Sequence, residues 1–168
     1  KAANVLVVNP ALPVNSVAEL IALAKAKPGQ LNYGSSGTGA SNHLAGELFR
    51  SMAGINIVRI NYKGAGPALN ALFANELQLM FPTAGAVAPH MKSGRLKVLA
   101  VTSAEPSPLA PGVPTMAAAG RPGYESIATY GVFAPARTQR AIIDRLNEEV
   151  VRFLARPDVK EKFLNLGL

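Results

Sequence analysis

The sequence contains no cysteine and no tryptophan, and only 6% of its residues are aromatic. Without cysteine the chain can form neither a disulfide bond nor a thiolate metal site. With so few aromatic side chains, a surface on which nucleic-acid bases stack is not expected. No apolar run is long enough to span a bilayer.

Charged residues are also scarce, at 16%, and they are mostly basic, which gives the 168 residues a net charge of +7. Lysine and arginine are spread along the chain without a basic run, so nucleic-acid binding is not indicated. The charge mildly favours anionic ligands. With 49% hydrophobic residues the chain can bury a core as one domain, or as one domain with an appendage. It begins at Lys1 without a signal peptide, so we interpret it as a mature form or an excised fragment.

The most informative segment is a loop of glycine and hydroxyl residues at 34–41, between an apolar run and an amphipathic one. Such a loop can turn sharply and leave its backbone N–H groups unpaired above the first turn of the next helix. A helix N-terminus carries unpaired N–H groups and the positive end of the helix dipole, so it favours an anion. The sequence therefore predicts a loop that binds a small anion, most simply a carboxylate.

The hydrophobic pattern predicts strands and helices in alternation. Ser16 and Glu19 form a capping box, and Thr138 is expected to cap a long amphipathic helix whose apolar face packs on the core. Pro89 permits only a broken or late-starting helix. Strands are expected at 4–9, 31–34, 55–61, 76–81 and 97–101. Helices are expected at 16–27, 42–53, 67–75, about 86–92, 138–155 and 157–166, with one helical turn at 115–119.

This alternation predicts an α/β fold: a parallel sheet, mixed at its edge, with helices on both faces. In a parallel sheet every strand-to-helix loop lies at the same edge. The loops at 34–41, 62–66 and 82–85, together with Thr102 and Ser103, should therefore meet at one rim. That rim is where α/β folds bind their ligands.

The loop does not match the motifs of nucleotide-binding or hydrolytic enzymes. Its glycines, Gly34, Gly37 and Gly39, have neither the dinucleotide spacing nor the lysine of a phosphate-binding loop. With two histidines and no acidic partner near either, we expect no catalytic residue, no metal site and no cofactor. An α/β enzyme for acyl or phosphoryl transfer stays as the alternative, with His43 as its one acid–base candidate at the loop.

Seven blocks of sequence, the first of which contains the loop, come in a recognisable order. Together they resemble the substrate-binding receptors of tripartite tricarboxylate transporters, also called Bug receptors, over essentially the whole chain. The blocks are 31–39 with 43–49, 62–68, 78–81, 89–94, 99–103, 113–115 and 131–135. The resemblance implies a periplasmic receptor of two lobes that closes on a small carboxylate and delivers it to membrane subunits of the transporter, without chemistry.

The resemblance also implies the residues that hold the ligand, largely through backbone N–H groups and hydroxyls. For His43, Tyr62 and Tyr130, local packing is the alternative to ligand contact. Pro82 and Thr83 stand where the family often has Asp-Asn, so a different ligand preference is expected. The implied ligand-binding residues are Ser35, Ser36, Gly37, Thr38, Gly39, Ala40, Ser41, His43, Tyr62, Pro82, Thr83 and Tyr130.

Members of this family are longer at the N-terminus, so the chain is expected to lack most of the first lobe. Residues 1–9 would be a strand that crosses from that lobe, and 10–128 the second, ligand-binding lobe. Residues 129–168 would cross back and form C-terminal helices of the first lobe. A missing lobe should expose apolar surface around Val5–Val8 and Gly131–Pro135, so we expect self-association.

Overall fold

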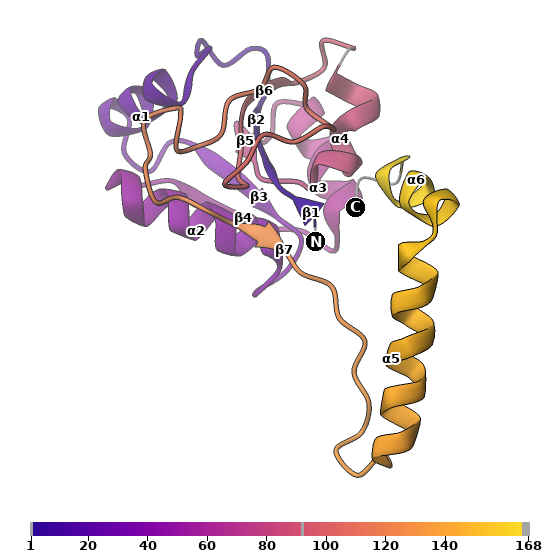
Figure 1. Cartoon of the computed structure of the whole chain (residues 1–168). Helices are drawn as coiled ribbons and strands as arrows, with labels where there is room; N and C mark the ends of the chain where they lie inside the picture. The colour runs from indigo at the N-terminus through magenta and orange to yellow at the C-terminus, as the bar shows by residue number, and fades with distance from the viewer. Residues whose placement is uncertain (1, 92, 166–168) are drawn as a thin grey trace.

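The computed structural model describes residues 2–91 and 93–165, and its centre is a five-stranded sheet (Figure 1). The strands lie in the order β4-β3-β5-β2-β6. A separate two-stranded ribbon pairs the first strand with the last. In chain order the strands are β1 (Ala2–Ala3), β2 (Val5–Val8), β3 (Asn32–Ser35), β4 (Val58–Asn61), β5 (Leu79–Met80), β6 (Lys97–Val101) and β7 (Ile127–Ala128).

The sheet is mixed but mostly parallel, which confirms the predicted fold class. β3 pairs in parallel with β4 and with β5, whereas β2 runs antiparallel to both β5 and β6. The four strands other than β2 therefore share one direction. The antiparallel strand lies inside the sheet rather than at its edge, and all four of its side chains are buried. The expected exposure of Val5–Val8 is therefore wrong, because helices cover both faces of this strand.

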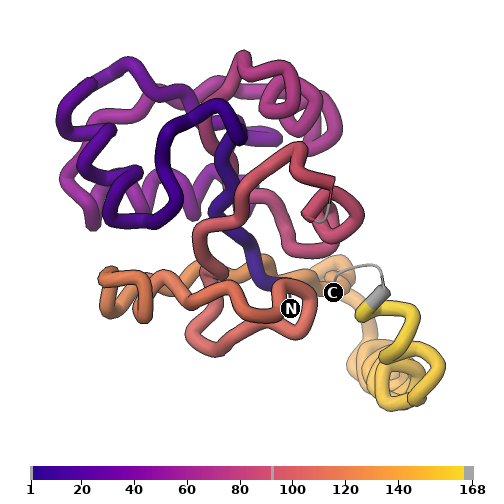
Figure 2. The backbone as a smooth tube through the Cα atoms, turned by 90° about the horizontal axis from the view of Figure 1, so that it is seen from above, coloured from indigo at the N-terminus to yellow at the C-terminus, as the bar shows by residue number. Residues whose placement is uncertain are grey.

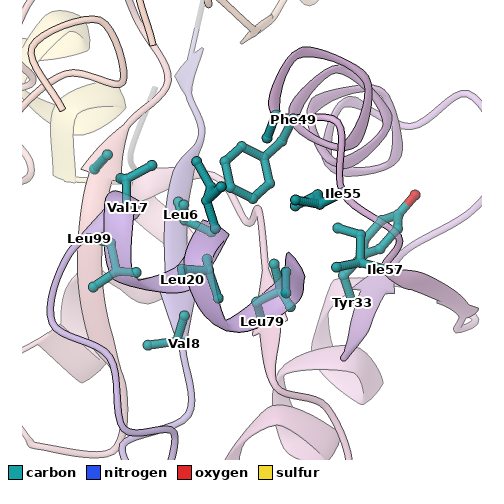
Figure 3. Packing of buried hydrophobic residues seen from close by; sticks show 14 of the residues in the cluster. Leu6, Val8, Val17, Leu20, Tyr33, Phe49, Ile55, Ile57, Leu79 and Leu99 are labelled. Atoms are coloured by element: carbon teal, nitrogen blue, oxygen red, sulfur yellow. The ribbon is translucent and has the colours of Figure 1, made fainter. Parts of the chain in front are cut away.

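Helices cover both faces of the sheet (Figure 1). Helices α1 (Val17–Ala26) and α2 (Ser41–Ala53) pack on one face, with Leu20 and Phe49 in a core shared with Leu6 and Tyr33 (Figure 3). Helices α3 (Ala65–Phe73) and α4 (Ala84–Met91) cover the other face.

Local sequence signals predict the ends of some helices correctly and the ends of others incorrectly. The Ser16 hydroxyl accepts a hydrogen bond from Glu19 N–H at 3.1 Å, as the capping box predicts. Pro89 lies inside α4, so the expectation of a broken helix is wrong; the helix is only eight residues long and loses little by one missing N–H. Helix α3 begins at Ala65, before Pro67, and residues 116–120 form a turn without a helix. The expected ends at Lys92 and Leu166 lie outside the described residues.

The strands predicted at 55–61 and 76–81 are shorter, at β4 and β5, because their first residues form the connections to the preceding helices. Asn75 is one such connecting residue. It adopts a left-handed conformation, with φ of 61°.

The C-terminal part extends away from the α/β body. After β7 an extended segment leads to α5 (Arg140–Ala155), and α6 (Pro157–Asn165) follows (Figures 1 and 2). Thr138 does not cap α5; Gln139 stands at the N-cap and makes no side-chain bond to the helix. No side chain of α5 is buried, so the predicted core packing of this helix is wrong for the chain as described. Phe133, before the helix, is 93% exposed, as expected for 131–135.

One close contact fixes α2 against the sheet. A Cβ atom built on Gly46 of α2 would lie 2.4 Å from the ring of Tyr33, which is fully buried on β3. Only glycine permits the helix to approach this ring so closely. The Tyr33–Gly46 contact therefore sets the height of α2 over the sheet.

We expect Gly46→Ala to lower the free energy of unfolding by about 1–3 kcal/mol, because the buried Tyr33 ring has no room to move aside. Gly66→Ala in α3 is the matched control, since a Cβ there would meet nothing within 4 Å. That change should stabilise the chain by up to about 1 kcal/mol through helix propensity. Urea denaturation of both variants measures the difference, and equal effects would contradict the account.

Candidate ligand-binding site

The C-terminal ends of β3, β4, β5 and β6 lie at one edge of the sheet, because these strands run in the same direction. Helices α2, α3 and α4 each begin within a few residues of this edge. The predicted loops at 34–41, 62–66 and 82–85 therefore share a rim, as the sequence indicates.

Two side chains of α2 hold the loop that precedes it. The Asn42 side chain accepts a hydrogen bond from Ser36 N–H at 3.1 Å and donates to the Ser36 hydroxyl at 2.9 Å. Nδ1 of His43 accepts from Gly39 N–H at 3.0 Å. Gly39 has φ of +81°, a conformation that side chains disfavour. The loop is thus closed back onto the first turn of its own helix.

Several backbone donors at this helix tip stay unpaired. No side chain caps α2, whose N-cap residue is Ala40. Within residues 2–91 and 93–165, no acceptor lies in reach of the N–H groups of Gly37, Thr38, Ser41, Asn42 and His43. Such a cluster of donors at the positive end of a helix dipole is suited to an anion.

Asn4 lies beneath this helix tip, where β2 begins. Its Nδ2 donates to Phe81 O at 2.5 Å and lies 3.4 Å from the Ser41 hydroxyl. Its backbone oxygen accepts from both N–H and hydroxyl of Thr102, and it forms an isolated bridge with Thr83. The fully buried Asn4 therefore joins the rim ends of three strands to α2.

A shallow pocket of about 280 Å³ opens between this helix tip and the segment around β7. It brings together three residues of the predicted site, Gly39, Ser41 and Tyr130. Leu44, Ile127, Ala128 and Thr129 complete its lining. Tyr130 is 65% exposed at the side of this pocket.

The remaining predicted residues lie at different depths of the same rim. Ser35 is fully buried and its hydroxyl bonds to Asn61 Oδ1 at 3.2 Å, so it supports the loop from below. Tyr62 is half-buried, and its N–H bonds to Ser35 O. Pro82 is buried with its oxygen bonded to Val5 N–H, and Thr83 is half-buried. The exposed Thr38 accepts a hydrogen bond from Arg59 at 2.9 Å.

Sequence reasoning missed Asn4, Asn42 and Arg59. Asn42 could have been found, because a short amide side chain in the first turn of a helix often bonds to nearby backbone. Asn4 and Arg59 reach the rim only through the tertiary fold.

Comparison with known proteins identifies the family. Residues 1–168 match the profile described as "Tripartite tricarboxylate transporter family receptor". The chain belongs to this receptor family. Protein BugT of Bordetella pertussis is 37% identical to the receptor chain over 163 residues, which are 97% of this chain and 50% of BugT.

Two solved structures of similar proteins agree with this assignment. "R. palustris Rpa4515 with adipate" is 38% identical, with a TM-score of 0.91 over 99% of the receptor chain and 56% of the other. Periplasmic binding protein BugD is 29% identical, with a TM-score of 0.84 and the same coverage. The receptor chain spans about half the length of the relatives it matches. The family consists of solute-binding receptors, which argues against the alternative of an acyl- or phosphoryl-transfer enzyme.

Among the described residues of the receptor chain, no group of three or more histidine or acidic side chains is placed to hold a metal ion. In the same residues, no helix is both long and apolar enough to cross a membrane.

A hydrogen-bonded network behind the helix tip ties α2 to the sheet of the receptor chain. The Tyr33 hydroxyl donates to Glu47 at 2.6 Å, and Arg50 pairs with the same carboxylate at 2.6 Å. The pKa of Glu47 is lowered, first by the Tyr33 hydrogen bond and further by Arg50, against the opposing effect of burial. Burial and the neighbouring carboxylate raise the pKa of Tyr33.

Tyr33→Phe should lower the free energy of unfolding by about 1 kcal/mol at pH 7 and by less at pH 3. Because folding lowers the pKa of Glu47, its contribution is complete above the ordinary carboxyl pKa and is lost as pH falls through the lowered one. The measurement is urea denaturation across this range.

Tyr124→Phe is the matched control, because the buried Tyr124 hydroxyl donates to the neutral Ala45 oxygen of the same helix at 2.8 Å. Its stability loss should not change between pH 3 and pH 7. A Tyr33→Phe loss as flat with pH as that of Tyr124→Phe would contradict the network.

Proposed function

We propose that this chain is the ligand-binding lobe of a periplasmic receptor that captures a small dicarboxylate for a tripartite transporter. The observation that carries this is the cluster of unpaired N–H groups at the tip of α2, on the rim of a receptor-family fold. Support comes from the similar R. palustris protein, whose structure is described as having adipate.

In this proposal one carboxylate of the ligand accepts hydrogen bonds from N–H groups of the loop and of the first turn of α2. The free donors of Gly37, Thr38 and Ser41 provide the first contacts, and the Ser36 and Ser41 hydroxyls add to them. Charge-assisted bonds from backbone N–H to a carboxylate are strong and need no titratable group. The receptor binds and releases its ligand without changing it.

The other predicted residues line the remaining rim. Ser35, Ala40 and Pro82 shape the loop and strand ends from below, while Tyr62, Thr83 and Tyr130 face the ligand from the sides. Asn4 keeps Ser41 in place. Pro82 and Thr83 bring no carboxylate to the rim, so the site favours ligands without an amino group.

Ribbon β1–β7 suggests how the lobe joins the rest of such a receptor. Both strands run beside each other, and after β7 the chain leads away from the sheet to α5 (Figure 1). Residues 1–9 and 129–168 would then be the two crossings, and α5 would pack into the other lobe with its exposed apolar side chains. Closure of that lobe over the pocket beside Tyr130 would enclose the ligand, and the closed receptor would dock on the membrane subunits.

Gly39→Asp, placed in a protein of the relatives' length that carries this chain, should weaken adipate binding by at least about a hundredfold. The aspartate puts a like charge beside the ligand carboxylate and strains a backbone with φ of +81°. Gly94→Asp is the control, because Gly94 has a similar φ of +72° and open space. It lies at the opposite edge of the sheet. Calorimetry that finds equal affinities for the two variants would exclude the loop.

The isolated 168-residue chain should bind adipate at least about a hundredfold more weakly than a protein of the relatives' length. That factor corresponds to about 3 kcal/mol of contact free energy supplied by the other lobe. Calorimetry on both proteins under the same conditions makes the comparison. Equal affinity would contradict the two-lobe site.

A further inference from the structure

A hydrogen bond joins the Gly39 N–H of the loop to the imidazole of His43. The protonation state of a titratable side chain therefore decides whether this N–H is free. Gly39 N–H donates to Nδ1 of His43 at 3.0 Å. Nδ1 can accept only while it carries a lone pair, so the imidazole is neutral here and holds its proton on Nε2. In this state Gly39 N–H is occupied, and a ligand can bind it only by breaking its bond to His43.

Protonation of His43 changes both partners of this bond. Imidazolium carries hydrogen on both ring nitrogens, so Nδ1 becomes a donor and the Gly39 N–H is released. The loop then has one more free N–H beside the pocket that Gly39 and Ser41 line. The half-buried His43 ring adds a positive charge at the first turn of α2.

The charged and titratable groups around His43 come from three elements. Helix α2 itself carries Glu47 and Arg50, which pair with each other at 2.6 Å. Strand β4 brings Arg59, whose guanidinium bonds to Thr38. The segment around β7 brings Tyr130, which lines the pocket together with Gly39 and Ser41. Glu47 is already paired with Arg50, whereas Arg59 keeps its positive charge because its partner Thr38 is neutral. A bound dianion is therefore the new negative charge that His43 would meet.

We propose that His43 is a positioning residue that couples carboxylate binding at α2 to the uptake of one proton. The inference rests on the proposed function. The bound carboxylate takes the Gly39 N–H from His43, and the freed Nδ1 binds a proton from solvent. The Gly39 N–H exchanges its hydrogen bond with His43 for one with the carboxylate. Nδ1 then forms a covalent bond to the proton taken from solvent, and the resulting imidazolium faces the anion. Opposite charges in such proximity favour the charged form of the histidine.

The second histidine of the chain provides a matched control. His90 lies on α4, where its ring packs edge-on against Phe73 with 5.0 Å between the ring centroids. It bonds to no residue of the loop at 34–41 among the described contacts. A His90→Asn variant should therefore bind and titrate like the unchanged protein.

The test is calorimetry of adipate binding in a protein of the relatives' length, in two buffers of different ionisation enthalpy. The unchanged protein should take up protons on binding, and its affinity should fall about tenfold between pH 6 and pH 8.5, as one interaction with a charged imidazole is lost. His43→Asn keeps an acceptor at the position of Nδ1 but cannot be protonated. This variant should bind with the same affinity at both pH values and take up no proton.

A second measurement needs no ligand and uses the 168-residue chain. The Gly39 amide signal in NMR spectra should shift with pH as His43 titrates, and this shift should vanish in His43→Asn and persist in His90→Asn. A Gly39 signal that ignores pH would overturn the proposal.

The two proposals fail in different ways. Adipate binding with equal proton uptake in unchanged protein and His43→Asn would overturn the role of His43 and leave the proposed function standing. Because the unchanged protein and His43→Asn are compared at the same pH, any protons that adipate itself gains or loses are the same in both measurements and cancel. Absence of dicarboxylate binding at every pH would overturn both proposals.

Discussion

Unpaired backbone N–H groups at the tip of α2 are the feature on which the whole account depends. A helix that begins at a strand end, with alanine at its N-cap, leaves its first donors without a side-chain partner. In a buried site that would be costly, but at an open rim the donors are available to an anion. The small residues of the loop keep side chains away from these donors. Geometry and charge therefore favour the same class of ligand.

This helix tip is held from several sides by groups that bind no ligand. Gly46 lets α2 lie against the Tyr33 ring, and Glu47 ties the helix to the same tyrosine. Tyr124 bonds to the Ala45 oxygen from the segment that leads to β7. Asn4 reaches Ser41 from below. A donor cluster fixed in this way loses little further conformational entropy when it binds, which favours affinity.

Much of the fold could be predicted because its signals are local. The Ser16–Glu19 capping box spans four residues, and glycine-rich loops after apolar runs identify strand ends without knowledge of their neighbours. The interior place of β2 could not be predicted, since strand order depends on pairing between distant segments. Helix α5 shows a related limit. Its apolar stripe indicates burial, yet nothing in the stripe identifies the surface that covers it.

The candidate site shows the same division. The loop and its glycines stand out in the sequence, but Asn4 enters the rim through a contact with Phe81, 77 positions away. Arg59 reaches Thr38 across the sheet edge. Ser35 looks like its hydroxyl neighbours in the sequence, yet the structure places it fully buried beneath them. Residue type alone does not distinguish a loop's exposed donors from its supports.

An amide NMR titration of the isotope-labelled protein, at the length of its relatives, with adipate tests the central claim most directly. The account predicts that the largest shifts fall on Gly37–Gly39 and Ser41–His43, at the tip of α2. Saturable shifts centred elsewhere, such as around Lys97 and Leu109 at the other end of β6, with the helix tip unchanged, would contradict it.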